Sequence, residues 1–419
     1  MPSSVRVRRS PVDYGAVHAD DHLRPWHEAA ADLIPGLELF DAHTHTGEND
    51  PDGIRCTADE LIEGLELAGA RAVVFTTQEP DGYSAANDRV IDEAERSGGR
   101  LVPFCRLDPA DEPLREAERA LARGARGIKL HPRAEQFRLD DERLEPVFAL
   151  ADERGLPVIA HAGRGIPALG RDALDITARH PGLRLILAHD GVCDLAWIWR
   201  HAPDHPNLFF DTAWWSVADH LALFGLVPPG QILFASDMPY GTTLLASILT
   251  IRCALQAGLS PDQVRVIGGE QLTRILAGET PRDLGPAPRR GGAADVVLDR
   301  VHTYLVTGVG RMMIGDRAPD YIGLARLACE VGEDAPQAGT CTSVLELLDR
   351  MEAFAADYKE PARPPGAHLL RPFRGVALVI AAAAVALTPD VPLPDVGDRA
   401  EVAERAKRDE RHRSDRQKG

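Results

Sequence analysis

The sequence predicts an α/β protein whose main domain is a (β/α)8 TIM barrel spanning residues 37–278. Short apolar segments typical of buried strands alternate with amphipathic segments over this range, as parallel βα units require. Eight such strands can be counted, and polar residues fall at the ends of several of them. A doubly wound open sheet would alternate in the same way. The choice of a barrel therefore depends on the number of strands and on those polar residues.

The predicted strands are short and mostly apolar. They read LELFDAHTHT from residue 37, AVVFTTQ from 72, LVPFCRLD from 101, RGIKLHP from 126, LPVIAHAG from 156, RLILAHDG from 184, NLFFDTA from 207 and ILFASDMP from 232. Helical signals lie between them. Thr57 and Glu60 form a capping box and Gly69 ends that helix. Segments 84–99 and 111–125 place apolar residues at three- and four-residue spacing, as helices that cover a barrel do.

The remaining sequence divides into four segments around the predicted barrel. We expect an N-terminal extension over residues 1–36, a Pro/Gly/Arg-rich linker over 279–294, a mainly helical C-terminal domain over 295–395 and a charged tail over 396–419. Nothing in the C-terminal domain indicates chemistry, and we interpret its His302 as a structural or surface residue.

One segment of the C-terminal domain is apolar throughout. It runs from Val376 to Leu387, which is 12 residues. About 20 residues are needed to cross a bilayer, so this run predicts a buried helix.

Composition and charge narrow the class of function. The formal net charge of −17 argues against nucleic-acid and anionic-membrane partners, which require a basic patch. A small-molecule substrate is the expectation, and homo-oligomerisation stays open. The six cysteines are scattered without CxxC pairs, which predicts reduced thiols. The arginines near the N-terminus precede no apolar run, so no secretory signal is expected and a cytoplasmic location follows by default.

The first predicted strand carries an HxH motif. His43 and His45 are two apart, so in a strand both imidazoles project from the same face. The motif alone is weak, because 15 histidines in 419 residues predict roughly half an HxH by chance.

Further polar residues strengthen this signal because each closes a predicted strand. His161 follows the fifth strand, His189 the sixth and Asp237 the eighth, and Lys129 ends the fourth. Burying so many polar groups at the carboxyl ends of strands is costly unless something charged binds them. A metal ion is the simplest such partner.

This set resembles the amidohydrolase superfamily, particularly its amidohydrolase-related branch of hydrolases, decarboxylases and hydratases. The resemblance covers about 240 residues and rests on the HxH of the first strand, the histidines of the fifth and sixth, and the aspartate of the eighth. It implies that His43, His45, His161 and Asp237 bind one divalent cation per chain, most often Zn²⁺.

The resemblance also implies roles in catalysis. An open position on such a cation lowers the pKa of bound water toward about 7. Asp237 would accept the water proton and return it to the leaving group, whereas His189 would polarise the substrate carbonyl or bind the metal. In some members of the superfamily a lysine that ends the fourth strand is carboxylated and bridges two metals. A carboxylated Lys129 would imply two ions, but we favour one.

Other side chains near the strand ends are candidates for a substrate pocket. They are Arg106, Lys129, His131, Arg164, Asp211, Trp214 and Trp215. Arginine binds carboxylates and tryptophan packs on apolar rings. Ion pairs for the arginines and loop packing for the tryptophans are equally good interpretations.

Three functions follow in order of preference. The first is hydrolysis of a C–N or C–O bond of a small carbonyl substrate by metal-activated water. The second is non-oxidative decarboxylation or hydration of a small carboxylic acid at the same site. The third is a metal-stabilised scaffold without catalysis. A structural zinc site is usually closed and rich in cysteine, which this set is not.

Overall fold

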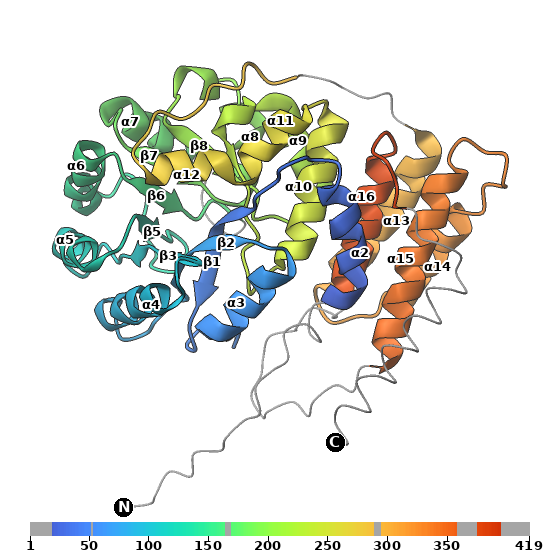
Figure 1. Ribbon diagram of the computed structural model, residues 1–419, viewed down its shortest axis with the longest axis horizontal. Helices are drawn as coiled ribbons and strands as arrows, with labels where there is room; N and C mark the ends of the chain where they lie inside the picture. Colours follow the sequence, from blue (N-terminus) through green and yellow to red (C-terminus); the bar gives the residue numbers. More distant parts are fainter. Residues whose placement is uncertain (1–18, 52, 164–168, 289–294, 358–374, 395–419) are drawn as a thin grey trace, which may run out of the picture.

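The computed structural model describes residues 19–51, 53–163, 169–288, 295–357 and 375–394. Its strands lie at the centre, with helices around them and a further group of helices on one side (Figure 1). The predicted tail over residues 396–419 and the candidate residue Arg164 lie outside the described residues.

Every predicted strand is present, and all neighbours in the sheets are parallel. The strands are β1 (Phe40–Thr46), β2 (Arg71–Thr76), β3 (Leu101–Pro103), β4 (Cys105–Arg106), β5 (Ile128–Leu130), β6 (Pro157–Ala160), β7 (Arg184–Leu187), β8 (Leu208–Asp211) and β9 (Ile232–Leu233). The predicted third strand is divided at Phe104. β3 pairs with β2 and β4 pairs with β5, and the Phe104 amide still donates to Val74.

The last strand meets the first, so the sheet closes. Beyond β9 the chain runs along β1, where the Ala42 amide donates to Phe234, the Asp237 amide to His43 and the His45 amide to Met238. The predicted barrel is therefore confirmed, since a doubly wound sheet has no such closing contact.

Side chains alternate across the barrel wall, as the period of a strand requires. Ile159, Ile186 and Phe209 belong to a buried cluster that draws on strands around the ring, which is the barrel interior. Their neighbours Val158 and Leu185 pack with the surrounding helices.

The helices that follow the strands surround the barrel (Figure 1). They are α3 (Ala58–Leu67), α4 (Ser84–Arg96), α5 (Pro113–Arg123), α6 (Glu145–Arg154), α7 (Gly170–Arg179), α8 (Leu195–Ile198), α9 (Val217–Leu226), α10 (Thr243–Ala257), α11 (Pro261–Arg265) and α12 (Gln271–Leu276). Single turns stand at η1 (Glu142–Leu144), η2 (His189–Gly191), η3 (Ala202–Asp204), η4 (Pro229–Gln231) and η5 (Val266–Glu270). The capping box of Thr57 and Glu60 is present at the start of α3, as predicted.

A helix from the N-terminal extension packs on the barrel. It is α2 (Asp20–Ala31), which lies along α10. Thr242 donates to the Asp20 carboxylate at 3.0 Å, and His27 Nδ1 lies 2.6 Å from the Ser247 hydroxyl. These buried contacts fix α2 against the last large helix of the barrel.

The C-terminal region is helical, as predicted. It contains α13 (Val296–Met312), α14 (Pro319–Ala328), α15 (Ala338–Asp357) and α16 (Val376–Leu387). α16 is the predicted apolar helix, and it lies between α13 and α15 on one side and α10 on the other (Figure 1). None of the described helices is long and apolar enough to span a bilayer.

Arg252 joins α10 to the chain that follows α16. The residue is 2% exposed. Its guanidinium donates to Thr388 Oγ1 at 2.9 Å, to the Thr388 carbonyl at 2.9 Å and to the Pro392 carbonyl at 3.0 Å. Burial lowers the pKa of Arg252 to about 10. This side chain therefore supplies the polar part of an otherwise apolar contact.

Replacing Arg252 by methionine is expected to lower the free energy of unfolding, because each buried acceptor left unpaired costs roughly 1–3 kcal/mol. The urea midpoint followed by circular dichroism measures this loss. Arg265→Met is the control, since Arg265 makes only partly exposed ion pairs with Asp262 and Glu270 worth about 0–1 kcal/mol. Equal midpoints for the two variants would show that Arg252 does not join α10 to the C-terminal helices.

Candidate metal centre

The predicted chemical residues meet at the carboxyl ends of the strands. His43 and His45 lie on β1, where the pairing with β2 changes register between Asp41 and Thr44. Such irregularities re-aim side chains near functional sites. Both rings contact Phe75, at centroid distances of 5.1 and 4.6 Å, so both face the barrel interior.

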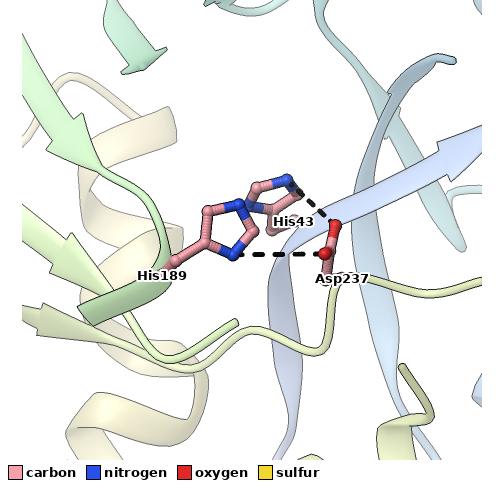
Figure 2. Close-up of side chains that lie close together, drawn as sticks. All are labelled: His43, His189 and Asp237. Carbon is pink, nitrogen blue, oxygen red and sulfur yellow. Dashed lines mark ion pairs between the residues drawn. The ribbon is translucent and has the colours of Figure 1, made fainter. Parts of the chain in front are cut away.

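Three of these side chains could share one metal ion. His43, His189 and Asp237 each offer a ligand atom, and these atoms lie within 4.8 Å of one another (Figure 2). His43 Nε2 lies 3.3 Å from Asp237 Oδ1, and His189 Nδ1 lies 4.0 Å from Asp237 Oδ2. Two imidazoles and a carboxylate are a typical donor set for Zn²⁺.

His45 and His161 stand beside this group. His45 Nε2 lies 3.2 Å from Asp237 Oδ1, and His161 Nδ1 lies 2.9 Å from His189 Nε2. The other ring nitrogen of His161, Nε2, is buried and, within the described residues, has no hydrogen-bond partner. The nitrogens that face the candidate ligands are His45 Nε2 and His161 Nδ1, so these two atoms fit a cation among these side chains as additional ligands.

Asp211 orients two of the histidines. Its Oδ2 lies 2.8 Å from His43 Nδ1, while its Oδ1 accepts the amides of His189 at 2.9 Å and Ala213 at 3.1 Å. A carboxylate accepts, so His43 carries its proton on Nδ1 and presents the Nε2 lone pair to the centre. The sequence placed Asp211 at the pocket but gave no signal of this orienting contact.

Asp41 has a related structural role beneath the centre. Its Oδ1 accepts the amides of His43 and Ser236, both at 3.0 Å, and thereby joins β1 to the segment that follows β9. Burial raises the pKa of Asp41 to about 7.

Lys129 lies inside the barrel against His43. Its Nζ is 3.0 Å from His43 Nε2 and 4.4 Å from the centroid of the Phe75 ring. Burial lowers the pKa of Lys129, and the charges of Asp211 and Asp237 oppose this shift. Burial likewise raises the pKa of Asp237. The centre therefore contains an amine with weakened affinity for its proton beside a carboxylate with increased basicity.

Left-handed backbone conformations occur at two of the strand ends. His189 and Asp190 have φ of 59° and 58°, and Asp237 has φ of 57°. Such conformations cost non-glycine residues about 1–3 kcal/mol each and are frequent at functional sites. Here they occur at two of the three residues that converge on one metal position.

The other predicted pocket residues have varied surroundings. Arg106 is 2% exposed and donates to Glu135 at 2.7 Å, which matches the ion-pair interpretation. The His131 ring stacks on His161 at 4.0 Å. The Trp214 ring lies 6.0 Å from His189, and its indole N–H donates to Asp219 at 2.8 Å.

Sequence reasoning missed a buried ion pair next to the centre. Asp190 and His220 are fully buried, with Asp190 Oδ2 2.9 Å from His220 Nδ1. Burial alone would lower the pKa of His220, but the Asp190 carboxylate and the Trp214 carbonyl raise it on balance. His220 lies in α9, where a histidine in an amphipathic segment gives no signal of such a contact.

Comparison with known proteins agrees with this architecture. The family model described as amidohydrolase matches residues 40–270, more than half of the chain. No curated protein sequence matches the chain.

Several solved structures are similar to part of the chain. An uncharacterised TIM-barrel protein from Bordetella bronchiseptica is 18% identical, with 58% of this chain and 99% of that chain covered and a TM-score of 0.47. A putative amidohydrolase from Staphylococcus aureus is 16% identical, with 57% and 100% covered and a TM-score of 0.48. The 5-carboxyvanillate decarboxylase of Sphingomonas paucimobilis is 16% identical, with 58% and 99% covered and a TM-score of 0.46.

Proposed function

Because the chain belongs to the amidohydrolase family, whose members are generally metal-dependent enzymes, we propose that its barrel is a hydrolase for a small carbonyl substrate. The bond cleaved is a C–N or C–O bond, and the nucleophile is water. The observation that carries the proposal is the convergence of His43, His189 and Asp237 within 4.8 Å.

The histidines and Asp237 would hold a single divalent cation, Zn²⁺ in our proposal. His43 offers Nε2, because its Nδ1 faces Asp211. His161 offers Nδ1, which lies 2.9 Å from His189 Nε2. His189 lies next to His161, and His45 contributes Nε2, which faces the same Asp237 oxygen as His43 does. Bound there, the cation supplies Lewis acidity that polarises a carbonyl and lowers the pKa of water.

Asp237 is the proton carrier in this proposal. Its side chain is 22% exposed, so one edge is open to water and substrate while the other contacts the histidines. Burial alone raises its pKa, and a cation bound beside it would oppose that shift. Asp237 takes the proton of the attacking water and delivers it to the leaving nitrogen or oxygen.

The substrate would lie against the rings that border the centre. We assign His131 and Trp214 to this border, because their rings pack on His161 and His189. Arg106 already pairs with Glu135, so its part is to hold the loop that follows β5. An apolar or planar substrate suits such rings.

Decarboxylation of a small acid is the second candidate, favoured by the cationic side of the barrel. Lys129 and Arg106 end neighbouring strands and both lie next to the histidines. A substrate carboxylate would be attracted to Lys129, because Arg106 is already paired with Glu135. Carbon dioxide release from benzoate-type acids, measured beside hydrolysis of amides and lactones, distinguishes the two reactions.

Metal analysis tests the proposal. The purified protein should contain about one equivalent of a divalent cation by inductively coupled plasma mass spectrometry, and its removal should abolish turnover while the circular dichroism spectrum is retained. Turnover that persists without metal would overturn the proposal. Unfolding on metal removal, with no turnover found in either screen, would instead support a structural scaffold.

Lys129→Met is expected to retain about one equivalent of metal, because the proposed ligands are histidines and Asp237 and methionine fills the buried volume of the lysine. The same mass spectrometry checks this result. A different result would mean that a carboxylated Lys129 bridges two ions. In that case the unaltered protein contains two equivalents of metal, the variant contains fewer, and added bicarbonate does not restore the metal content of the variant.

A further inference from the structure

A buried ion pair lies directly behind His189. Asp190 Oδ2 is 2.9 Å from His220 Nδ1, and neither side chain has any exposed surface. The other ring nitrogen of His220 lies 3.1 Å from the Trp214 carbonyl. Both ring nitrogens thus face atoms that only accept, so the ring donates from both and carries a positive charge.

This contact joins three segments that border the centre. Asp190 belongs to η2, Trp214 to the loop after β8, and His220 to α9. His220 therefore fixes the distance between the turn that carries His189 and the loop that carries Trp214.

The His189 imidazole depends on both of these segments. Its Nδ1 lies 2.5 Å from the Ala213 carbonyl. The next carbonyl in the chain, that of Trp214, is the one that His220 contacts. A carbonyl oxygen only accepts hydrogen bonds, so His189 is protonated on Nδ1. Its Nε2 therefore carries the free lone pair. The rotation of the ring and the position of its lone pair follow from where the loop holds Ala213.

The backbone of the turn also needs external support. His189 and Asp190 are successive non-glycine residues in the left-handed region, a conformation that persists only where the surroundings enforce it. A buried ion pair adds little to stability by itself, because desolvation offsets the attraction. Its place next to this turn gives it a different purpose.

We propose that the Asp190–His220 pair is a positioning device that aims the His189 imidazole at the metal position. The inference rests on the proposed function, because it requires a cation there. Asp190 and His220 touch neither the ion nor the substrate. They act through His189 and through the Trp214 loop.

The test uses Co²⁺, whose visible absorption reports the geometry of its ligands. His220→Phe removes both polar contacts and keeps a ring of similar size. The affinity for Co²⁺, measured by competition with a chelator, is expected to fall about 10- to 100-fold, as when a residue that orients a metal ligand is lost. The absorption bands should shift as well.

His180→Phe is the matched control. His180 is also buried, and its Nε2 lies 3.1 Å from Glu145 Oε1. It stands at the end of α7, before β7, and so at the opposite end of the barrel from His189. This variant should lower the melting temperature without changing the affinity for Co²⁺ or the spectrum.

Each outcome decides between the alternatives. Unchanged affinity and bands in His220→Phe would overturn the positioning role. A wild-type protein that binds no Co²⁺ would overturn the proposed function and this inference together. If His220→Phe does not fold, Asp190→Asn keeps the shape and removes the charge. It should shift the Co²⁺ bands in the same direction, and unshifted bands would again overturn the role.

Discussion

Replacing His43 and His45 together by alanine is expected to abolish both metal binding and turnover. His43 faces Asp211, Lys129 and Asp237, and His45 faces Asp237. Loss of both rings removes two nitrogen donors and leaves Asp211 Oδ2 without the partner that it has in His43. We expect metal content below about a tenth of an equivalent and a decrease in kcat/KM of more than about 10⁴-fold, which corresponds to roughly 5 kcal/mol.

The control removes two histidines from the other end of the barrel. His180 and His205 precede β7 and β8, where they contact Glu145 and Thr177. His180→Ala/His205→Ala should lose stability but keep its metal and its kcat. If the His43/His45 variant kept a full equivalent of metal, the centre would have to be sought elsewhere in the chain.

Asp237→Asn is expected to lower kcat by about 10²- to 10⁴-fold, the usual range for loss of a general base. The amide keeps the size of the carboxylate and one oxygen that can bind a cation, but it cannot accept the proton of water. Steady-state kinetics and metal content, measured on the same sample, separate the two effects. Metal should be partly retained while kcat falls.

Asp219→Asn is the matched substitution at the edge of the site. Asp219 accepts the indole N–H of Trp214 and contacts none of the proposed ligands within the described residues. Its loss should change KM more than kcat, through the Trp214 loop. An Asp237→Asn variant with wild-type kcat would contradict the role of Asp237 as proton carrier.

The fold class and the family are confirmed, because both depend on features that the sequence displays locally. Strands buried inside a barrel are short and apolar, and they end where a polar residue is required. For example, VIAHAG marks both the end of β6 and His161. The apolar run at 376–387 indicated burial on every side, and α16 has this environment. The metal ligands and their roles stay predictions.

Other features could not be predicted because they depend on contacts between distant residues. α2 contains Pro25, and its first turn has no side-chain cap, so the local sequence argues against a helix. The residues that α2 contacts at α10, Thr242 and Ser247, lie more than 200 positions later in the sequence. The Asp190–His220 pair is similar, since only the packing of α9 against η2 brings the two residues together.

The closing contact of the barrel and the candidate centre share the same peptides. The Asp237 amide donates to the His43 carbonyl at 3.0 Å, so the hydrogen bond that joins the two ends of the sheet also brings these two side chains together. During synthesis, His43 emerges from the ribosome almost 200 residues before Asp237. A nascent or truncated chain that lacks the final strand thus has the histidines but not the carboxylate. Under the proposed function, such a chain is expected to be inert until the segment that follows β9 has been made.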